Sequence, residues 1–242
     1  MLTVAQALQD FITEQRQRFN DENNNLFAFS LGQVERYYRL LGLVLDRYIE
    51  AGAHWLTTLR RWNATAAALR QHESLDADLV ALWETLDKAV LSAQLEVETF
   101  YLLAKIMLDR IAHFIEFYFG AAQKCSLDSH DDLNRCFKRY CALKELEYDD
   151  RLTGFVADLK HRISDFRDYH ISHEKSGRTI RGINVSSHGR VVMPMGRIFP
   201  KASDKVVISE DLVILGSTLD DYLLALLAFL RRNSSRSRLT AT

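Results

Sequence analysis

This chain of 242 residues contains only two prolines, and the first of them is Pro194. Because proline is the residue that interrupts a helix most strongly, its absence leaves most of the chain free to form long helices. Apolar residues before Pro194 recur at spacings of three and four, which is the period of one face of a helix. The sequence therefore predicts a predominantly α-helical protein.

Capping residues indicate where the predicted helices begin. Ser30 and Gln33 have the spacing of a capping box, so a second helix is expected to start at Ser30, after the polar run 21–25. The predicted helices start near Thr3, Ser30, Leu79, Ser129, Asp149 and Ser217 or Thr218. This series of helices favours an all-α, up-and-down bundle in a single domain that covers residues 1–242.

The period of the apolar residues changes from helical to alternating after Arg178. Residues 179–185 and 190–193 read as two strands joined by the turn 186–189, and residues 205–208 are a candidate third strand. We therefore expect a small β hairpin or flap, inserted at 177–208 before the last helix.

Charge and cysteine content exclude several classes of protein. Lys and Arg number 31 and Asp and Glu number 32, so no overall field draws the chain to nucleic acid or to a membrane. The three cysteines form no CxxC pair, which argues against a disulfide framework and a zinc knuckle. The apolar stretch 222–230 is far shorter than the roughly 20 residues that span a bilayer. A cytoplasmic protein without a membrane partner is expected, with a flexible basic tail at 233–242.

The most informative stretch lies at the end of the predicted fifth helix. Arg167 is followed by Asp168, and His173 comes after five intervening residues. This segment resembles the HEPN superfamily, whose signature is an arginine, a polar residue and then a histidine after four to six positions. The run 166–173 is especially similar to the phage-abortive-infection branch of that superfamily. Two other pairs, Arg47 with His54 and Arg181 with His188, also fall within this range, with six intervening residues each, but lack the polar residue.

The resemblance implies a metal-independent endoribonuclease that cleaves single-stranded RNA, without a cofactor, in phage defence or a toxin–antitoxin pair. In such an enzyme His173 would carry protons, Arg167 would bind the scissile phosphate and Asp168 would orient the pair. The resemblance also implies a homodimer with two facing motifs, and an antitoxin-like protein is a further candidate partner. The residues expected to contact RNA are His170, Arg178, Arg181, Arg190 and Arg197.

Other interpretations of the same residues remain open. His173 falls on the apolar stripe of its helix, seven residues after Phe166, and a core histidine bonded to a carbonyl would fit there. Asp168, His170 and His173 could be proposed as metal ligands, but no further cluster at ligand spacing supports them, and no metal site is predicted. The alternative function is a non-catalytic helical module that binds RNA, a nucleotide or a protein. The third hypothesis is a helical bundle with a purely structural role in a larger assembly.

Overall fold

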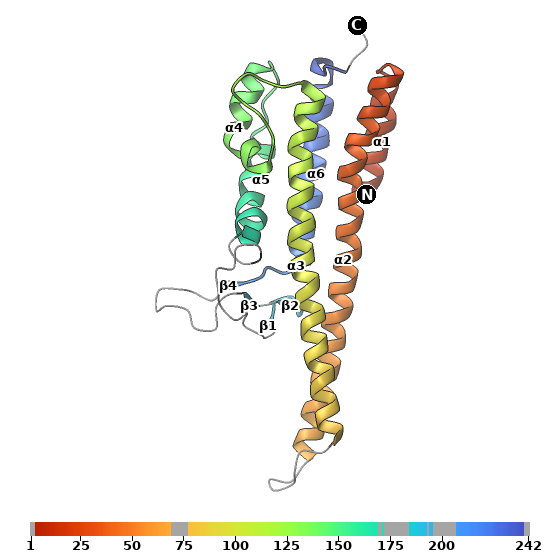
Figure 1. Ribbon diagram of the computed structural model, residues 1–242, viewed down its shortest axis with the longest axis vertical. Coiled ribbons are helices and arrows are strands. Elements are labelled where there is room, and N and C mark those ends of the chain that lie inside the picture. Colours follow the sequence, from red (N-terminus) through yellow and green to blue (C-terminus); the bar gives the residue numbers. More distant parts are fainter. Residues whose placement is uncertain are drawn as a thin grey trace, which may run out of the picture. The chain divides into compact units, whose positions relative to one another are not determined.

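The computed structural model describes residues 3–68, 77–168, 171, 184–192, 194–195 and 207–239 (Figure 1). The α-helices in these residues are α1 (Val4–Arg16), α2 (Asp21–Ala68), α3 (Ala77–Phe119), α4 (His130–Leu143), α5 (Asp150–Leu159) and α6 (Leu212–Arg232). The π-helix η1 (Lys160–Asp165) continues α5, and the 3-10 helix η3 (Ser234–Arg236) follows α6. The predicted all-α fold with a small β segment is confirmed.

The β segment consists of two short antiparallel pairs. β1 (Asn184–Val185) pairs with β2 (Val191–Val192), which confirms the predicted hairpin with a shorter ladder than expected. Gly189 in its turn has a φ of +73°, a conformation that glycine adopts without strain. β4 (Val207–Ile208) confirms the third predicted strand, but it pairs with β3 (Pro194–Met195) in a separate sheet.

The chain divides into two compact units, where the sequence predicted a single domain. Unit 1 comprises Met1–Leu41, Tyr101–Ser172 and Gly216–Thr242, and unit 2 comprises Gly42–Phe100 and His173–Leu215. The two long helices α2 and α3 contribute residues to both units.

Aromatic rings fill the core of unit 1 where α1, α2 and α3 meet. Phe11, Phe19, Phe27 and Phe114 all lie with ring centroids between 5.8 and 6.4 Å from the ring of Tyr118. The Tyr118 hydroxyl donates a hydrogen bond of 2.7 Å to the Gln15 side chain, so the polar end of this buried ring is satisfied. The core of unit 1 is therefore built around one tyrosine.

The C-terminal residues also pack on this core. Ser237 Oγ donates a 3.1 Å hydrogen bond to the backbone carbonyl of Tyr118, and the side chain of Leu239 is buried. Asn233 Oδ1 accepts a 2.7 Å hydrogen bond from the backbone of Glu147. The tail predicted over 233–242 therefore contains residues that pack on unit 1, up to Leu239 among the described residues, through contacts that the sequence does not display.

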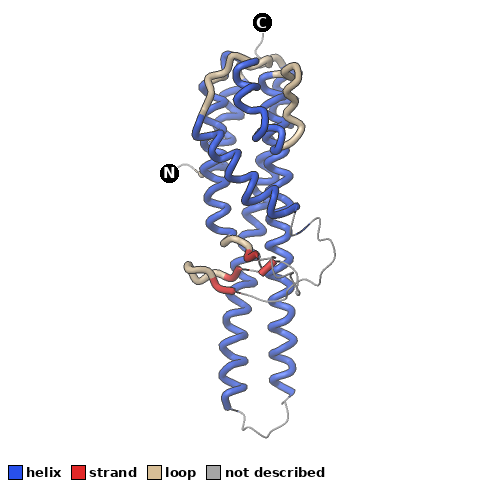
Figure 2. The backbone as a smooth tube through the Cα atoms, turned by 90° about the vertical axis from the view of Figure 1, so that its left-hand side faces the viewer, coloured by secondary structure: helices blue, strands red, loops and turns tan. Residues whose placement is uncertain are grey.

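Unit 2 contains the parts of α2 and α3 that run side by side (Figure 2). Trp62 and Trp83 lie 6.2 Å apart between ring centroids, and Arg47 forms a 3.0 Å ion pair with Glu96. Both contacts join a residue of α2 to a residue of α3. The two helices of this unit are therefore an antiparallel pair.

Two predicted helix starts are wrong, and both errors have the same physical cause. Asn20 accepts a 2.9 Å hydrogen bond from the backbone of Asn23, so α2 begins at Asp21 and the polar run 21–25 is its first turn. Asp211 accepts a 3.1 Å bond from the backbone of Val213, so α6 begins at Leu212. In both cases a polar residue, Asn20 or Asp211, caps the N-terminus of a helix that begins earlier than the sequence predicted.

Among the described helices, α6 is the one whose length and composition would allow it to cross a membrane, with a mean hydropathy of 1.8. In the structure 56% of that apolar window is buried. Tyr222 and Leu226 have no exposed surface. More than half of the apolar window of α6 is therefore packed inside the protein.

Two glycine-to-alanine substitutions should change stability in opposite directions. Gly120 ends α3 with a φ of +88°, so Gly120→Ala should lower the free energy of unfolding by about 1 kcal/mol. Gly154 lies inside α5 with open space around its Cα, so Gly154→Ala should raise it by about 0.5–1 kcal/mol. Urea denaturation followed by circular dichroism measures both, and the same sign for both would contradict the backbone assignment.

Candidate functional site

The predicted motif begins where a π-helix returns to α-helical geometry. Asp149 caps α5 by accepting a 2.8 Å hydrogen bond from the backbone of Leu152, and the helix widens into η1 before it reaches Arg167. Such π-helical insertions occur frequently at functional sites, because they turn side chains away from the regular helical positions. Arg167 and Asp168 come after η1 and Phe166, and they form an ion pair with each other.

A ring contact fixes this segment in unit 1. Phe166 stacks on Tyr101 of α3, with the ring centroids 4.3 Å apart and the ring planes inclined by 20°. Tyr101 is fully buried, so Phe166 holds the start of the motif against the core. The side chain of Arg167 is 26% exposed and that of Asp168 is 33% exposed. The pair is therefore partly exposed, although Arg167 Nε and Asp168 Oδ1 are themselves buried.

Carboxylates compensate the basic side chains that precede Arg167. Asp165 forms ion pairs of 2.9 Å with both Lys160 and His161. Burial alone would raise the pKa of Asp165, but the hydrogen bonds from Lys160 and His161 outweigh it and hold the pKa below its usual range. Arg162 pairs with Asp158 at 2.8 Å. Little uncompensated positive charge is left on this part of the helix for a polyanion.

Unit 1 also contains buried polar groups that the sequence did not single out. The His130 ring nitrogens, the Tyr222 hydroxyl and the Ser164 hydroxyl have no hydrogen-bond partner among the described residues. His130 and Tyr222 meet edge to face, with centroids 6.3 Å apart. The only signal in the sequence was the position of His130 directly after Ser129, the N-cap of α4.

Burial lowers the pKa of His130 to about 3. The positive charges of Lys105 and Lys160 act in the same direction, and the negative charge of Asp109 opposes them. The backbone of His130 donates a 2.8 Å hydrogen bond to Asp109, which also pairs with Lys105 at 2.6 Å. His130 is therefore a neutral, buried imidazole at neutral pH.

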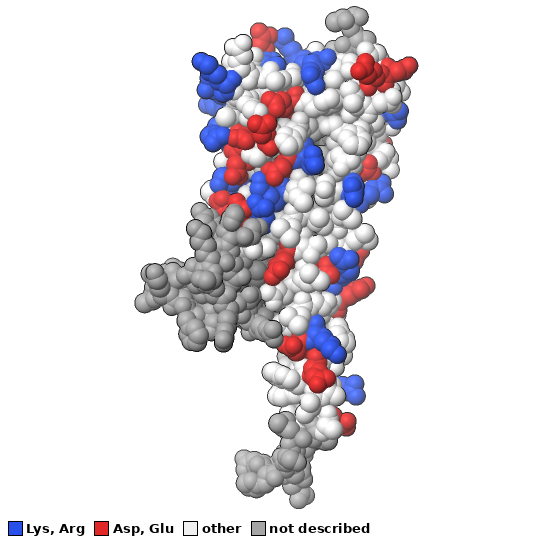
Figure 3. Space-filling model, viewed as in Figure 1, with Lys and Arg blue, Asp and Glu red and all other residues white. Residues whose placement is uncertain are grey.

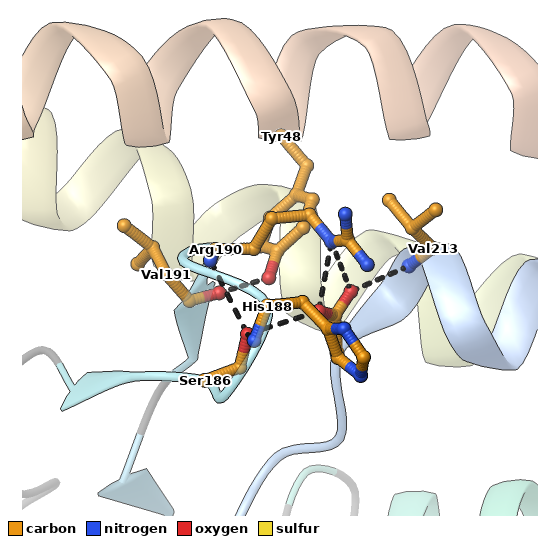
Figure 4. Close-up of polar contacts among 7 residues, drawn as sticks. Tyr48, Ser186, His188, Arg190, Val191 and Val213 are labelled. Carbon is orange, nitrogen blue, oxygen red and sulfur yellow. Dashed lines mark hydrogen bonds and ion pairs between the residues drawn. The ribbon is translucent and has the colours of Figure 1, made fainter.

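Of the arginines expected in the flap, the structure describes Arg190, and it is engaged inside unit 2. Its Nε atom lies 2.8 Å from each carboxylate oxygen of Asp211, whose side chain is only 4% exposed (Figure 4). Ser186 donates a 3.0 Å hydrogen bond to the same carboxylate, and the Tyr48 hydroxyl donates to the Val191 carbonyl. Arg190 therefore anchors the hairpin to the start of α6, and its charge is balanced there.

The remaining predicted site residues lie outside the described residues. These are His170, His173, Arg178, Arg181 and Arg197. The structure thus brings together Arg167 and Asp168 from the predicted constellation. No group of three potential metal ligands occurs among the residues that the structure describes.

Comparison of the chain with protein-family models, with curated proteins and with solved structures gave no match.

The buried imidazole predicts a loss of stability in acid. Below the ordinary histidine pKa of 6.5 the unfolded chain binds a proton at residue 130, whereas the folded chain binds it only near pH 3. The contribution of His130 is therefore complete above pH 6.5 and falls by about 1.4 kcal/mol for each pH unit below it. In His130→Phe the free energy of unfolding should decline less steeply between pH 6.5 and 4.5, as measured by denaturant titration.

His54→Gln is the matched control, because His54 is an exposed histidine of α2. This variant should keep the wild-type slope. Equal slopes for wild type and His130→Phe would contradict the assignment of a buried, neutral imidazole.

Proposed function

We propose that the chain is a HEPN-type endoribonuclease that cleaves single-stranded RNA without a metal or other cofactor. The observation that carries the proposal is the Arg167–Asp168 ion pair, held at the exit of a π-helix in an all-α protein, six positions before His173. The proposal places the enzyme in the cytoplasm and gives it RNA as substrate. Phage defence or a toxin–antitoxin pair, with an antitoxin-like protein partner, is the role that the resemblance supports.

Each residue of the motif has a chemical task in this proposal. Cleavage by the neighbouring 2′-OH requires removal of its proton, protonation of the leaving oxygen and stabilisation of charge on the phosphate. A histidine titrates near neutrality and can move both protons, which is the task assigned to His173. The guanidinium of Arg167 stays charged and presents a planar fork to phosphate oxygens. Asp168, already paired with Arg167, orients that fork.

Two copies of the motif would complete the site. On a regular helix a separation of six residues turns Arg167 and His173 about 120° apart, so the two side chains of one chain would not converge. The proposal therefore includes a homodimer in which motifs from two chains face each other.

One set of observations favours a second function, a non-catalytic helical module that binds RNA, a nucleotide or a protein. Lys160, Arg162 and Arg190 all pair with carboxylates, and the whole chain has a formal net charge of −1. RNA-cleaving enzymes ordinarily present an uncompensated basic surface to the phosphate backbone. The module needs no such surface if its ligand is a protein.

Cleavage of labelled single-stranded RNA in excess EDTA distinguishes the two functions. The enzyme should leave 2′,3′-cyclic phosphate ends and should not cut DNA of the same sequence, because DNA lacks the attacking 2′-OH. Arg167→Ala and His173→Ala should each lower turnover by a factor on the order of a hundred or more, since both groups act on the transition state. Neither should change the melting temperature appreciably.

Arg151→Ala on α5 and His54→Ala on α2 are the matched controls, because both replace exposed side chains of the same types outside the motif. They should cleave like the wild type. RNA that is bound but never cut would favour the module. If His173→Ala instead unfolds the protein and no RNA is cut by the wild type, the histidine is a core residue.

A further inference from the structure

All three cysteines of the chain lie in unit 1, and two of them are in direct contact. Cys125 Sγ donates a 3.5 Å hydrogen bond to the backbone carbonyl of Cys136, and the Cys136 side chain hydrogen-bonds with that of Cys125. Cys141 is close enough to Cys125 for the two thiols to interact electrostatically. The sequence showed no CxxC pair, so this cluster of thiols is a product of the fold.

The turn that carries Cys125 is held against α4. The Tyr140 hydroxyl, on α4, donates a 2.7 Å hydrogen bond to the carbonyl of Gly120. The backbone of Cys125 donates a 3.1 Å hydrogen bond to the carbonyl of Ala122, which closes the turn. A disulfide tolerates only a narrow range of Cα and Cβ positions. Because Cys125 and Cys136 are already in contact across fixed elements, little backbone movement is needed to join their sulfur atoms.

The three thiols differ in their access to solvent. Cys125 and Cys141 are buried, whereas Cys136 is half-buried on α4. In the view of Figure 1 α4 lies at the upper left, and Figure 3 shows Lys and Arg beside Asp and Glu on that part of the surface. This side of α4 therefore faces water, and a small oxidant from solution meets Cys136 before the other two thiols.

The environment of Cys125 protects it from direct oxidation. Burial raises the pKa of the Cys125 thiol to about 11, and its hydrogen bond with Cys136 acts in the same direction. The positive charge of Arg139 opposes both but does not outweigh them. Because the thiolate is the form that reacts with oxidants, a buried thiol that keeps its proton is a poor first target. Cys125 is suited instead to attack a neighbouring sulfur that has already been oxidised.

We propose that Cys125 and Cys136 form a redox pair, which hydrogen peroxide converts into an intramolecular disulfide. In the first step the Cys136 sulfur attacks one peroxide oxygen, the O–O bond breaks, and a sulfenic acid and water are formed. In the second step the Cys125 sulfur attacks the Cys136 sulfur, and hydroxide leaves with the Cys125 proton as water. The two thiols lose two electrons in total, and one peroxide is reduced to two waters. The pair does not depend on the proposed nuclease activity.

The other pairings of the three cysteines fit the geometry less well. Cys136 and Cys141 lie five positions apart on α4, which on a regular helix separates their Cα atoms by about 9 Å. A disulfide spans at most about 7 Å between Cα atoms. Cys125 and Cys141 are both buried, so neither is the thiol that peroxide reaches first. Cys125 with Cys136 is therefore the pair that the fold favours.

Peptide mapping of the full chain tests the pair. The protein is treated with hydrogen peroxide, unfolded in N-ethylmaleimide and digested with trypsin, which separates the cysteines into peptides 125–135, 136–138 and 140–144. Mass spectrometry should find 125–135 linked to 136–138, with 140–144 labelled. Dithiothreitol added before the label should return all three peptides to the labelled form. Three labelled peptides after peroxide, or a link to 140–144, would overturn the proposal.

Three serine variants separate the roles of the thiols. In Cys125→Ser the oxidised Cys136 has no partner and should accumulate as sulfinic acid, several-fold above the wild type. In Cys136→Ser, a half-exposed and mild substitution, Cys125 should stay a labelled thiol after peroxide. Cys141→Ser is the matched control and should form the 125–136 link like the wild type. A Cys136→Ser variant whose Cys125 is oxidised as fast as before would show that Cys136 is not the first target.

The bond should also be visible in the thermal stability of the protein. It would close the loop 125–136 and so restrict the unfolded chain, which should raise the melting temperature of the peroxide-treated wild type by roughly 5 °C. Cys136→Ser, treated in the same way, should show no rise. A lower melting temperature of the oxidised wild type would mean that the bond distorts unit 1, which contradicts a pair already positioned for it.

Discussion

The packing around Tyr118 is the interaction on which unit 1 depends. This ring near the end of α3 touches phenylalanines from α1 and α2, and its hydroxyl is satisfied by Gln15. Burial raises the pKa of Tyr118 to about 12, so the phenol stays neutral and keeps its proton for that hydrogen bond. With α3 fixed in this way, Tyr101, which lies about five turns earlier on the same helix, offers the surface on which Phe166 stacks. The position of Arg167 thus follows from the packing of a single helix.

The electrostatics of the protein are local, and they serve mainly to hold elements together. Asp165 binds two bases within η1, and Asp211 binds Arg190 at the start of α6. Burial would raise the pKa of Asp211, but the hydrogen bonds from Arg190 and Ser186 outweigh it and keep the carboxylate charged. Such pairs stabilise an orientation more than they add net stability, because desolvation offsets much of the attraction. The basic residues in these pairs therefore hold structural elements together. Binding of a functional anion would depend chiefly on Arg167.

The sequence predicted the elements that depend on local patterns and missed those that depend on distant contacts. The caps at Thr3, Ser129 and Asp149 were recognisable, because the side chain and the backbone that it binds lie three residues apart. The docking of Leu239 was not, because burial depends on which helices become neighbours. The motif at Arg167 could be found from its spacing alone, but its ion pair and the stacking of Phe166 required the structure.

Contacts between the two ends of the chain have a consequence for biosynthesis. Arg18 donates a hydrogen bond to the carbonyl of Ser234, and Asn23 donates one to the carbonyl of Leu239, in each case across 216 positions of sequence. Because proteins are made from the N-terminus at about 5–20 residues per second, Arg18 and Asn23 emerge from the ribosome long before these C-terminal partners. The contacts between α2 and α3 in unit 2 involve no C-terminal residue, so this helix pair can form while translation continues. The apolar face of α1 can pack on α2 and α3 once Tyr118 has been made, whereas the contacts of Arg18 and Asn23 with Ser234 and Leu239 form only after those residues have emerged.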